Sequence, residues 1–250
     1  MRKSKFMLSS WLAVTMLVSG MATAEAAGVG ANAANGQVIF TQGKGEAQAC
    51  QTCHGDKAQG NDAMGAPRLA NIGYTYIVKQ LTNFAQDKRT PAGLGAVMNG
   101  FAKALSEQDR RDVAAYVNTL NSAPELSDLK ALKAEGQQIG EVYKGAQIAE
   151  HGTKKVSACS SCHGFNGRGA DPMFPRIGQQ KYVYLVNQLK NWRDASRTND
   201  PLGQMRAIAK NLTDEDIVNV AAYLSQAAPT KGVGDEQPNN NTVLHEVTHK

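Results

Sequence analysis

Two short stretches of the chain share one uncommon pattern, Cys50-Gln51-Thr52-Cys53-His54-Gly55 and Cys159-Ser160-Ser161-Cys162-His163-Gly164. The second follows the first by 109 residues, and together they contain all four cysteines of the 250-residue chain. Cys-x-x-Cys-His is the attachment pattern of c-type haem, in which two thiols form thioethers with the porphyrin and the histidine ligates the iron. The pattern predicts two covalently bound haems, attached at Cys50, Cys53, Cys159 and Cys162, with His54 and His163 as iron ligands.

Three other uses of paired cysteines compete with haem attachment: a redox-active pair, a zinc site and structural disulfides. A redox pair is typical of a thioredoxin-like β-α-β context, which this sequence lacks, and zinc needs two more ligands near each pair. The five-residue pattern also occurs twice, at equivalent places in two similar segments. Haem attachment is therefore the favoured interpretation.

The similarity of the two segments continues well beyond the cysteines. Residues 74–84 recur as 182–192, and the following matches are Arg89-Thr90 with Arg197-Thr198, Met98 with Met205, and residues 114–116 with 221–223. Two homologous domains of about 90 to 100 residues each follow, a size that one small core supports. The predicted organisation is a signal peptide at 1–26, a first domain at 27–120, a linker at 121–137, a second domain at 138–228 and a polar tail at 229–250.

Both domains are predicted to be helical. Apolar residues recur at helical spacing in residues 77–84 and 185–192. The last segment of each repeat opens with a capping-box pattern, Ser106-x-x-Asp109 and Thr213-x-x-Asp216, followed by an amphipathic run. No window alternates apolar and polar residues with a β-rich composition, so the fold class is all-α.

The N-terminus has the features of a secretory signal: basic residues at 2, 3 and 5, an apolar run over 6–18, and small residues before Glu25. The apolar run is short for a membrane span, which needs about 20 residues. Cleavage is therefore favoured over the alternative of an uncleaved anchor. We expect a mature protein exported to an oxidising compartment, the bacterial periplasm.

The charge balance disfavours nucleic acid as a partner. Lys plus Arg is 27 and Asp plus Glu is 22, a formal charge of +5. Removing the three basic residues of the signal leaves 24 against 22, or about +2. Without a basic run, so small a charge gives no electrostatic footprint for nucleic acid.

The second axial ligand decides whether each iron can bind a substrate. Two pairs of methionines recur: Met98 and Met205 lie 44 and 42 residues after their histidines, and Met64 and Met173 lie 10 residues after theirs. The distal ligand must approach from the opposite face of the ring, and the later loop can wrap round the haem edge while the intervening helix packs beside it. We therefore favour Met98 and Met205, and interpret the other pair as apolar packing.

Other polar residues are candidates for supporting roles. The carbonyls of Pro67 and Pro175 are expected to accept a hydrogen bond from the haem-ligating histidines and so orient them. Further assignments remain open. Arg68 and Arg176 either pair with haem propionates or lie solvated at the surface, and His151 is either a surface residue or a ligand. The tyrosine pairs, Tyr74 with Tyr76 and Tyr182 with Tyr184, are expected to share core packing and propionate contacts. A metal site at His245 and His249 is also conceivable, although two histidines in a polar tail are more often solvated.

From about residue 36 to residue 228, the chain resembles the dihaem cytochrome c4 family, two class I cytochrome c domains in tandem after a signal peptide. The resemblance rests on the Cys-x-x-Cys-His-Gly motifs, the Pro-Arg-Leu/Ile turns, the Tyr-x-x-x-Gln-Leu helices and the Met-x-x-x-Ala-Lys-x-Leu segments. It implies His54 with Met98 on one iron and His163 with Met205 on the other. It also implies a pseudo-twofold packing that brings the propionate edges of the haems together.

With both irons saturated, the expected role is electron transfer rather than catalysis. We expect a monomer that carries electrons from a quinol-oxidising complex to a terminal oxidase or reductase, with peripheral association with the membrane left open. One rival is the haem subunit of an enzyme complex, such as flavocytochrome c sulfide dehydrogenase. A more distant rival is a dihaem peroxidase or thiosulfate-oxidising enzyme, which would need an open or unusual ligand position.

Overall fold

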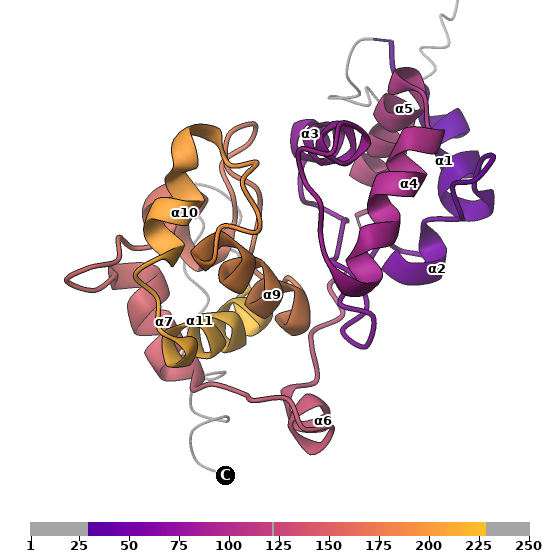
Figure 1. Cartoon of the computed structure of the whole chain (residues 1–250). Helices are drawn as coiled ribbons and strands as arrows, with labels where there is room; N and C mark the ends of the chain where they lie inside the picture. Colours follow the sequence, from indigo (N-terminus) through magenta and orange to yellow (C-terminus); the bar gives the residue numbers. More distant parts are fainter. Residues whose placement is uncertain (1–29, 122, 229–250) are drawn as a thin grey trace, which may run out of the picture.

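The computed structural model describes residues 30–121 and 123–228, and Figure 1 shows them as two helical bodies joined by a segment that carries α6. The predicted signal peptide at 1–26 and the tail at 229–250, with His245 and His249, lie outside the described residues. Within the first body the helices are α1 (Ala33–Gln42), α2 (Gln51–His54), α3 (Tyr74–Ala85), η1 (Gly93–Ala96), α4 (Val97–Ala104) and α5 (Glu107–Thr119).

The second body, domain 2, repeats the order of the first, domain 1, with one additional 3-10 turn, η2. Its elements are α7 (Val142–His151), α8 (Ser160–His163), η2 (Phe165–Gly167), α9 (Tyr182–Arg193), η3 (Pro201–Gly203), α10 (Gln204–Ala209) and α11 (Asp214–Gln226). The described residues contain no β-strand, only three isolated bridges. The all-α prediction is therefore confirmed.

In each domain the first helix packs against the last, α1 on α5 and α7 on α11. A glycine lies at the centre of each crossing. A Cβ at Gly36 would collide with the backbone carbonyl of Asp112, and a Cβ at Gly145 with that of Asn219. Glycine at these positions lets the two helix backbones approach closely enough to form a continuous core.

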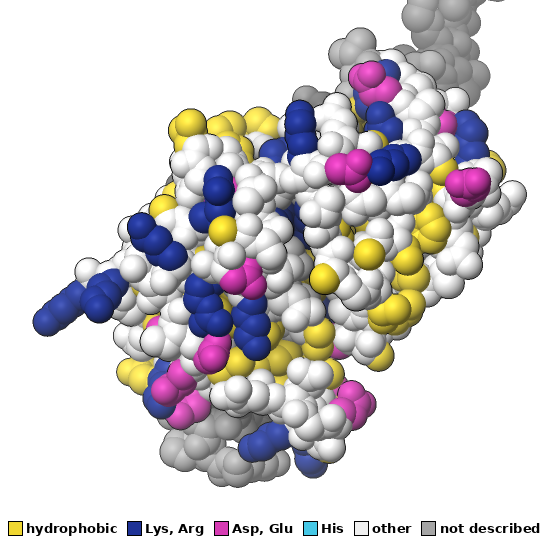
Figure 2. All heavy atoms as spheres, viewed as in Figure 1, with side chains coloured by type: hydrophobic (Ala, Val, Ile, Leu, Met, Phe, Trp, Pro, Cys, Tyr) yellow, Lys and Arg dark blue, Asp and Glu magenta, His cyan; other side chains and the backbone are white. Residues whose placement is uncertain are grey.

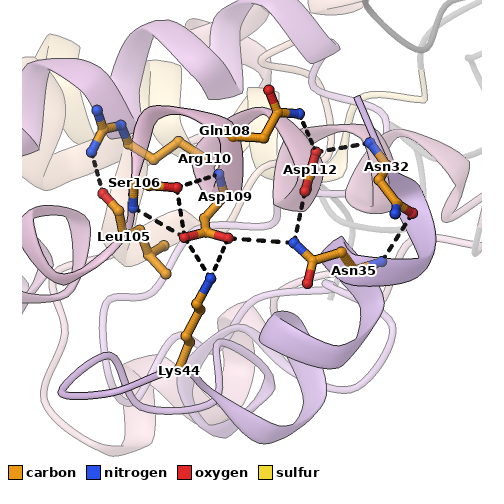
Figure 3. Close-up of polar contacts among 9 residues, drawn as sticks. All are labelled: Asn32, Asn35, Lys44, Leu105, Ser106, Gln108, Asp109, Arg110 and Asp112. Carbon is orange, nitrogen blue, oxygen red and sulfur yellow. Dashed lines mark hydrogen bonds and ion pairs between the residues drawn. The ribbon is translucent and has the colours of Figure 1, made fainter. Parts of the chain in front are cut away.

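The closing helices begin where the sequence predicts. Ser106 caps α5 and Thr213 caps α11, and both form complete capping boxes with the acidic residue three positions later. In domain 1 the capping acid Asp109 also receives Lys44 Nζ at 2.7 Å, which fastens the loop after α1 to the start of α5 (Figure 3). Such caps each contribute about 1 kcal/mol to helix stability.

Each domain has its own apolar core. Ile39, Phe40 and Val117 are almost fully buried in domain 1, where the Phe40 ring packs on Tyr116 with centroids 5.5 Å apart. In domain 2 the corresponding centre is formed by Tyr182, Ile217, Val220 and their neighbours. The helices predicted from residues 77–84 and 185–192 are α3 and α9, and each turns its apolar face to one of these cores.

The predicted linker contains a short helix that the sequence analysis does not anticipate, α6 (Leu129–Ala134), which is capped by the side chain of Asp128. The segment just before it is bound to domain 2. Ser127 Oγ accepts from the amide of Tyr182 at 2.9 Å, and the Ser127 carbonyl accepts from Gln226 Nε2 at 2.9 Å. Leu132 of α6 joins the core of domain 2.

Candidate haem sites and the interface between them

The two Cys-x-x-Cys-His segments fold as single helical turns. In α2 the amide of His54 donates to the carbonyl of Cys50 at 3.0 Å, and in α8 the amide of His163 donates to that of Cys159 at 2.8 Å. Gly55 and Gly164 end these turns with φ of 80° and 72°, in the left-handed region that glycine adopts freely. The turns set both cysteines and the histidine of each motif on one short piece of chain.

The cysteine chemistry fits covalent attachment better than redox exchange. All four thiols are free, and burial raises the pKa of Cys50 and of Cys159 to about 11. A disulfide-exchanging cysteine needs the opposite shift, because the thiolate is the nucleophile. The described residues also hold no cluster of three or more His, Cys, Asp or Glu side chains that could bind zinc. The structure gives no support to either alternative.

Each of the two histidines is oriented by one hydrogen bond. His54 Nδ1 lies 2.9 Å from the carbonyl of Pro67, and His163 Nδ1 lies 2.8 Å from that of Pro175. A carbonyl only accepts, so Nδ1 carries the proton and Nε2 keeps its lone pair for a metal. Burial lowers the pKa of both imidazoles, although the carbonyl contacts oppose this, so they stay neutral. The predicted hydrogen bonds between the two histidines and the proline carbonyls are confirmed.

The methionines differ in where the fold places them. Met98 and Met205 occupy the second positions of the matching helices α4 and α10, and both are half-buried. Met205 packs against the core of domain 2. Met173, by contrast, is 72% exposed, whereas its counterpart Met64 is half-buried. His151 is exposed at the end of α7.

Arg68 and Arg176 lie near each other where the two domains meet, lining one small cavity. Arg68 is only 3% exposed, so the solvated-surface alternative is wrong for this residue, and its Nε has no hydrogen-bond partner. Burial lowers the pKa of Arg68 to about 10, and the positive charge of Arg176 adds to the effect. A buried cation with an unused donor fits the carboxylate of a haem propionate.

A second pair of arginines crosses the domain boundary in a pseudo-twofold arrangement. Arg89 of domain 1 donates to Tyr184 Oη at 3.0 Å, and Arg197 of domain 2 donates to Tyr76 Oη at 3.2 Å. Each guanidinium also lies over an aromatic ring of its own domain, Arg89 over Phe84 and Arg197 over Trp192. The tyrosine hydroxyls that the sequence analysis left open are therefore partly assigned, since two of them contact arginines of the other domain.

Two glutamines complete this interdomain cluster, which we define as Tyr76, Gln80, Arg89, Tyr184, Gln188 and Arg197. Gln188 Oε1 accepts from Arg89 at 2.9 Å and from Arg197 at 2.7 Å, and Gln80 Oε1 accepts from the same two residues at 2.8 and 3.3 Å. The two glutamines and two arginines are repeat matches in the sequence, but the sequence alone gave them no role. The sequence feature that could have indicated a role is that they recur in both repeats as polar residues beside apolar helix faces.

The charge state of the interdomain cluster is unusual. Both arginines are 6% exposed, and no Asp or Glu of the described residues forms an ion pair with either. Burial lowers the pKa of Arg89. Burial acts to raise the pKa of Tyr184, but the positive charges of Arg89 and Arg197 outweigh it and lower this pKa. The interface therefore carries two buried positive charges with neutral hydrogen-bond partners.

The outer surface is mixed in charge. Figure 2 shows Lys and Arg side chains interspersed with Asp and Glu over the visible face, and apolar side chains gathered along part of domain 1. Across residues 30–121 and 123–228, no helix is long and apolar enough to cross a membrane.

Comparison with known proteins identifies the two halves. The family model for cytochrome c matches residues 33–121 and 142–228. A thiosulfate dehydrogenase electron acceptor from Stutzerimonas stutzeri (strain A1501) is 38% identical over 200 residues, covering 78% of this chain and 87% of the relative. Cytochrome c4 of Pseudomonas aeruginosa is 35% identical over 185 residues, covering 73% of this chain and 85% of the relative.

Solved structures match the whole two-domain arrangement. Reduced cytochrome c4 from Pseudomonas stutzeri is similar with a TM-score of 0.65 and 29% identity, covering 79% of this chain and all of that one. A thiosulfate dehydrogenase from Marichromatium purpuratum is similar with a TM-score of 0.69 and 29% identity over 77% of this chain. The similarity covers only 40% of that longer protein.

The local geometry and the comparisons converge on one assignment. The motifs supply four free thiols and two oriented imidazoles, and the cytochrome c model matches each half of the chain. Relatives of this type are electron-transfer proteins rather than enzymes. The chain belongs to the dihaem cytochrome c4 family, with one covalently bound haem c in each of its two cytochrome c domains.

Proposed function

We propose that each iron is held by a histidine and a methionine, His54 with Met98 in domain 1 and His163 with Met205 in domain 2. The matching positions of the two methionines at the starts of α4 and α10 support this ligand set. The other recurring pair, Met64 and Met173, lies in turns rather than on a helix.

Such ligation makes the protein an electron carrier. A haem bound on both axial sides supplies a one-electron couple and leaves no coordination position for a substrate. The protein contributes neutral, oriented imidazoles and an apolar core around each site, which limit reorganisation when the charge changes. The single observation that carries the proposal is the paired His–Pro hydrogen bond, which repeats in both domains within 0.1 Å.

For the donor, we propose a thiosulfate dehydrogenase. The support is the 38% identity to a thiosulfate dehydrogenase electron acceptor over 87% of that relative. A quinol-oxidising complex is the donor that the sequence analysis favours, and a terminal oxidase or reductase is the proposed acceptor in both cases. The basic, short apolar N-terminal segment supports a periplasmic location.

Reduction kinetics distinguish the two donors. The purified dihaem protein is mixed with a thiosulfate dehydrogenase and thiosulfate, or with a quinol-oxidising complex and quinol, and haem absorbance is followed in a stopped-flow instrument. We expect both haems to be reduced in the first mixture within the enzyme's turnover time, and neither with thiosulfate alone.

Fast reduction by the quinol complex and none by the dehydrogenase would contradict the proposed donor and restore the quinol-linked role. Flavin that copurifies with the protein in stoichiometric amount would contradict the free carrier and favour a subunit of a flavoprotein complex. The same samples give the haem content per chain, for which we expect two.

A further inference from the structure

One peptide group in domain 1 is hydrogen-bonded on both of its sides. The carbonyl of Pro67 accepts from His54 Nδ1 at 2.9 Å. The N–H of the same peptide group, which belongs to Arg68, donates to Gln180 Oε1 at 2.7 Å. A continuous chain of two hydrogen bonds therefore runs from the histidine of domain 1 through one amide to a side chain of domain 2.

Gln180 is held firmly in this position. It is 5% exposed, its Nε2 donates to the carbonyl of Arg68 at 2.9 Å, and its Oε1 accepts a second bond from the amide of Lys181 at 2.9 Å. The glutamine thus binds both backbone groups of Arg68, as a neighbouring strand would. Its position leaves no freedom for the Pro67–Arg68 peptide to rotate without breaking two buried hydrogen bonds.

Domain 2 has no equivalent of this arrangement. The carbonyl of Pro175 accepts from His163 Nδ1, but the N–H of Arg176 has no hydrogen-bond partner among the described residues. The residue of domain 1 that corresponds to Gln180 in the repeat is Ile72, which lines the same small cavity as Arg176 and has no polar atom to offer. The two otherwise matched histidine sites differ at this point.

Hydrogen bonds in a chain polarise one another. An acceptor on the N–H of an amide increases the negative charge on its carbonyl oxygen. The hydrogen bond that this oxygen accepts becomes stronger, by about 10 to 30% per bond. A stronger acceptor on Nδ1 makes the imidazole a better electron donor, which favours the oxidised metal. The effect requires no charged group and acts on one domain only.

We propose that Gln180 is a positioning residue for the haem of domain 1, which lowers the reduction potential of that haem from across the domain boundary. The inference rests on the ligand set proposed above, and not on the identity of the electron donor. It makes domain 2 part of the environment of His54, whereas no residue of domain 1 acts on His163 in the same way.

The test is a potentiometric titration of the full-length dihaem protein with Gln180→Leu, which keeps the side-chain size but removes both polar atoms. We expect the ratio of reduced to oxidised haem in domain 1, at a fixed ambient potential, to rise about threefold, or about 28 mV at 59 mV per tenfold. Domain 2 should not change. The two haems are assigned by comparison with Met98→Ala, which alters the spectrum of domain 1 alone.

Two further variants separate the amide from the interface as a whole. Lys79→Met removes another interdomain bond, from Lys79 Nζ to the carbonyl of Asn199 at 2.9 Å, without touching the histidine chain. Because it also removes a positive charge, it should raise the potential of neither haem. Gln180→Glu keeps an acceptor for the Arg68 N–H, so the potential of domain 1 should not rise.

A second readout is hydrogen exchange of the His54 Nδ1 proton in the reduced protein, which should be faster in Gln180→Leu and unchanged in Lys79→Met. Any of three results for the reduction potential of domain 1 would overturn the proposal. These are equal shifts in Gln180→Leu and Lys79→Met, an upward shift in Gln180→Glu, and no shift in Gln180→Leu. Failure of the ligand set is recognised separately, because the unsubstituted protein would then lack the charge-transfer band of a methionine-bound ferric haem.

Discussion

Replacing Arg89 and Arg197 by methionine, singly and together, tests whether the two buried cations of the interdomain cluster depend on each other. Both guanidiniums contact the same two glutamine oxygens, and both lie over an aromatic ring. Methionine keeps much of the apolar stem and removes the charge and the donors. Each single variant leaves the glutamine oxygens one remaining arginine donor, and the double variant leaves them none.

The structure supports a free-energy account of the cycle. Arg89 donates three hydrogen bonds to neutral acceptors, about 1 kcal/mol each, and its ring contact adds about 1 kcal/mol, a gross loss of about 4 kcal/mol. The two cations share Gln188 Oε1, so they lie within about 6 Å and repel by about 3 kcal/mol at an effective dielectric constant of about 20. Arg89→Met also removes this repulsion, which leaves a net cost of about 1 kcal/mol. Arg197 donates four hydrogen bonds and has its own ring contact, so the same reasoning gives a net cost of about 2 kcal/mol for Arg197→Met.

In the double variant both sets of contacts are lost, about 9 kcal/mol, but the repulsion of about 3 kcal/mol is relieved only once. The expected cost is therefore about 6 kcal/mol, well above the sum of the two singles, about 3 kcal/mol. The oxygen of Gln188, which then has no donor, acts in the same direction, whereas Gln80 Oε1 still accepts from Asn199 Nδ2 at 3.0 Å. The coupling is expected to be about 3 kcal/mol.

The assay is denaturant unfolding of the three variants and the parent, followed by haem-region circular dichroism, which reports on each domain and on their contact. Loss of the interface should appear as separation of one transition into two. A double variant that costs no more than the sum of the singles would refute the reasoning, because it would show that the two arginines neither repel nor share acceptors in solution.

Other predictions address the ligands and the acid stability. Met98→Ala should open the iron of domain 1 to carbon monoxide, seen as a shifted haem band of half the total amplitude; Met205→Ala should do the same in domain 2, and the control Met64→Ala should bind none. Asp109 has its pKa lowered to about 2 by hydrogen bonds that outweigh its burial, so its stabilisation is complete above about pH 4 and is lost as the pH falls towards 2. Asp109→Asn should therefore lower the free energy of unfolding of domain 1 by about 2 kcal/mol at pH 7 and make it depend less on pH between 4 and 2. Asp216 has no lysine partner, so Asp216→Asn should have a smaller effect.

Local chemistry was readable from the sequence, and contacts between the repeats were not. The capping boxes at Ser106 and Thr213 and the hydrogen bonds between the histidines and the proline carbonyls follow from short-range rules and are confirmed. The short helix α6 was missed, because six residues give too little periodicity to rise above a charged linker. The ligand assignment of Met98 and Met205 remains a prediction.

The interdomain cluster was out of reach for a different reason. Arg89 and Arg197 recur in the repeat, but recurrence does not say whether a residue faces its own core, the solvent or its sister domain. Only the docking of α3 against α9 turns Gln80 and Gln188 into shared acceptors. The cross-domain contact of Gln180 is hidden further, since its repeat partner is the apolar Ile72 and no comparison of the two halves draws attention to it.

A duplicated protein can thus tune its two haems in two ways. Residues related by the pseudo-twofold axis, such as Arg89 and Arg197, place their positive charge between the domains. Any preference that this charge creates for the reduced state is shared by both haems. A residue that breaks the symmetry, such as Gln180, acts on one histidine and not on the other. Because the difference between two potentials sets the net direction of electron transfer, this direction in a carrier with matched ligands must come from the residues in which the repeats disagree.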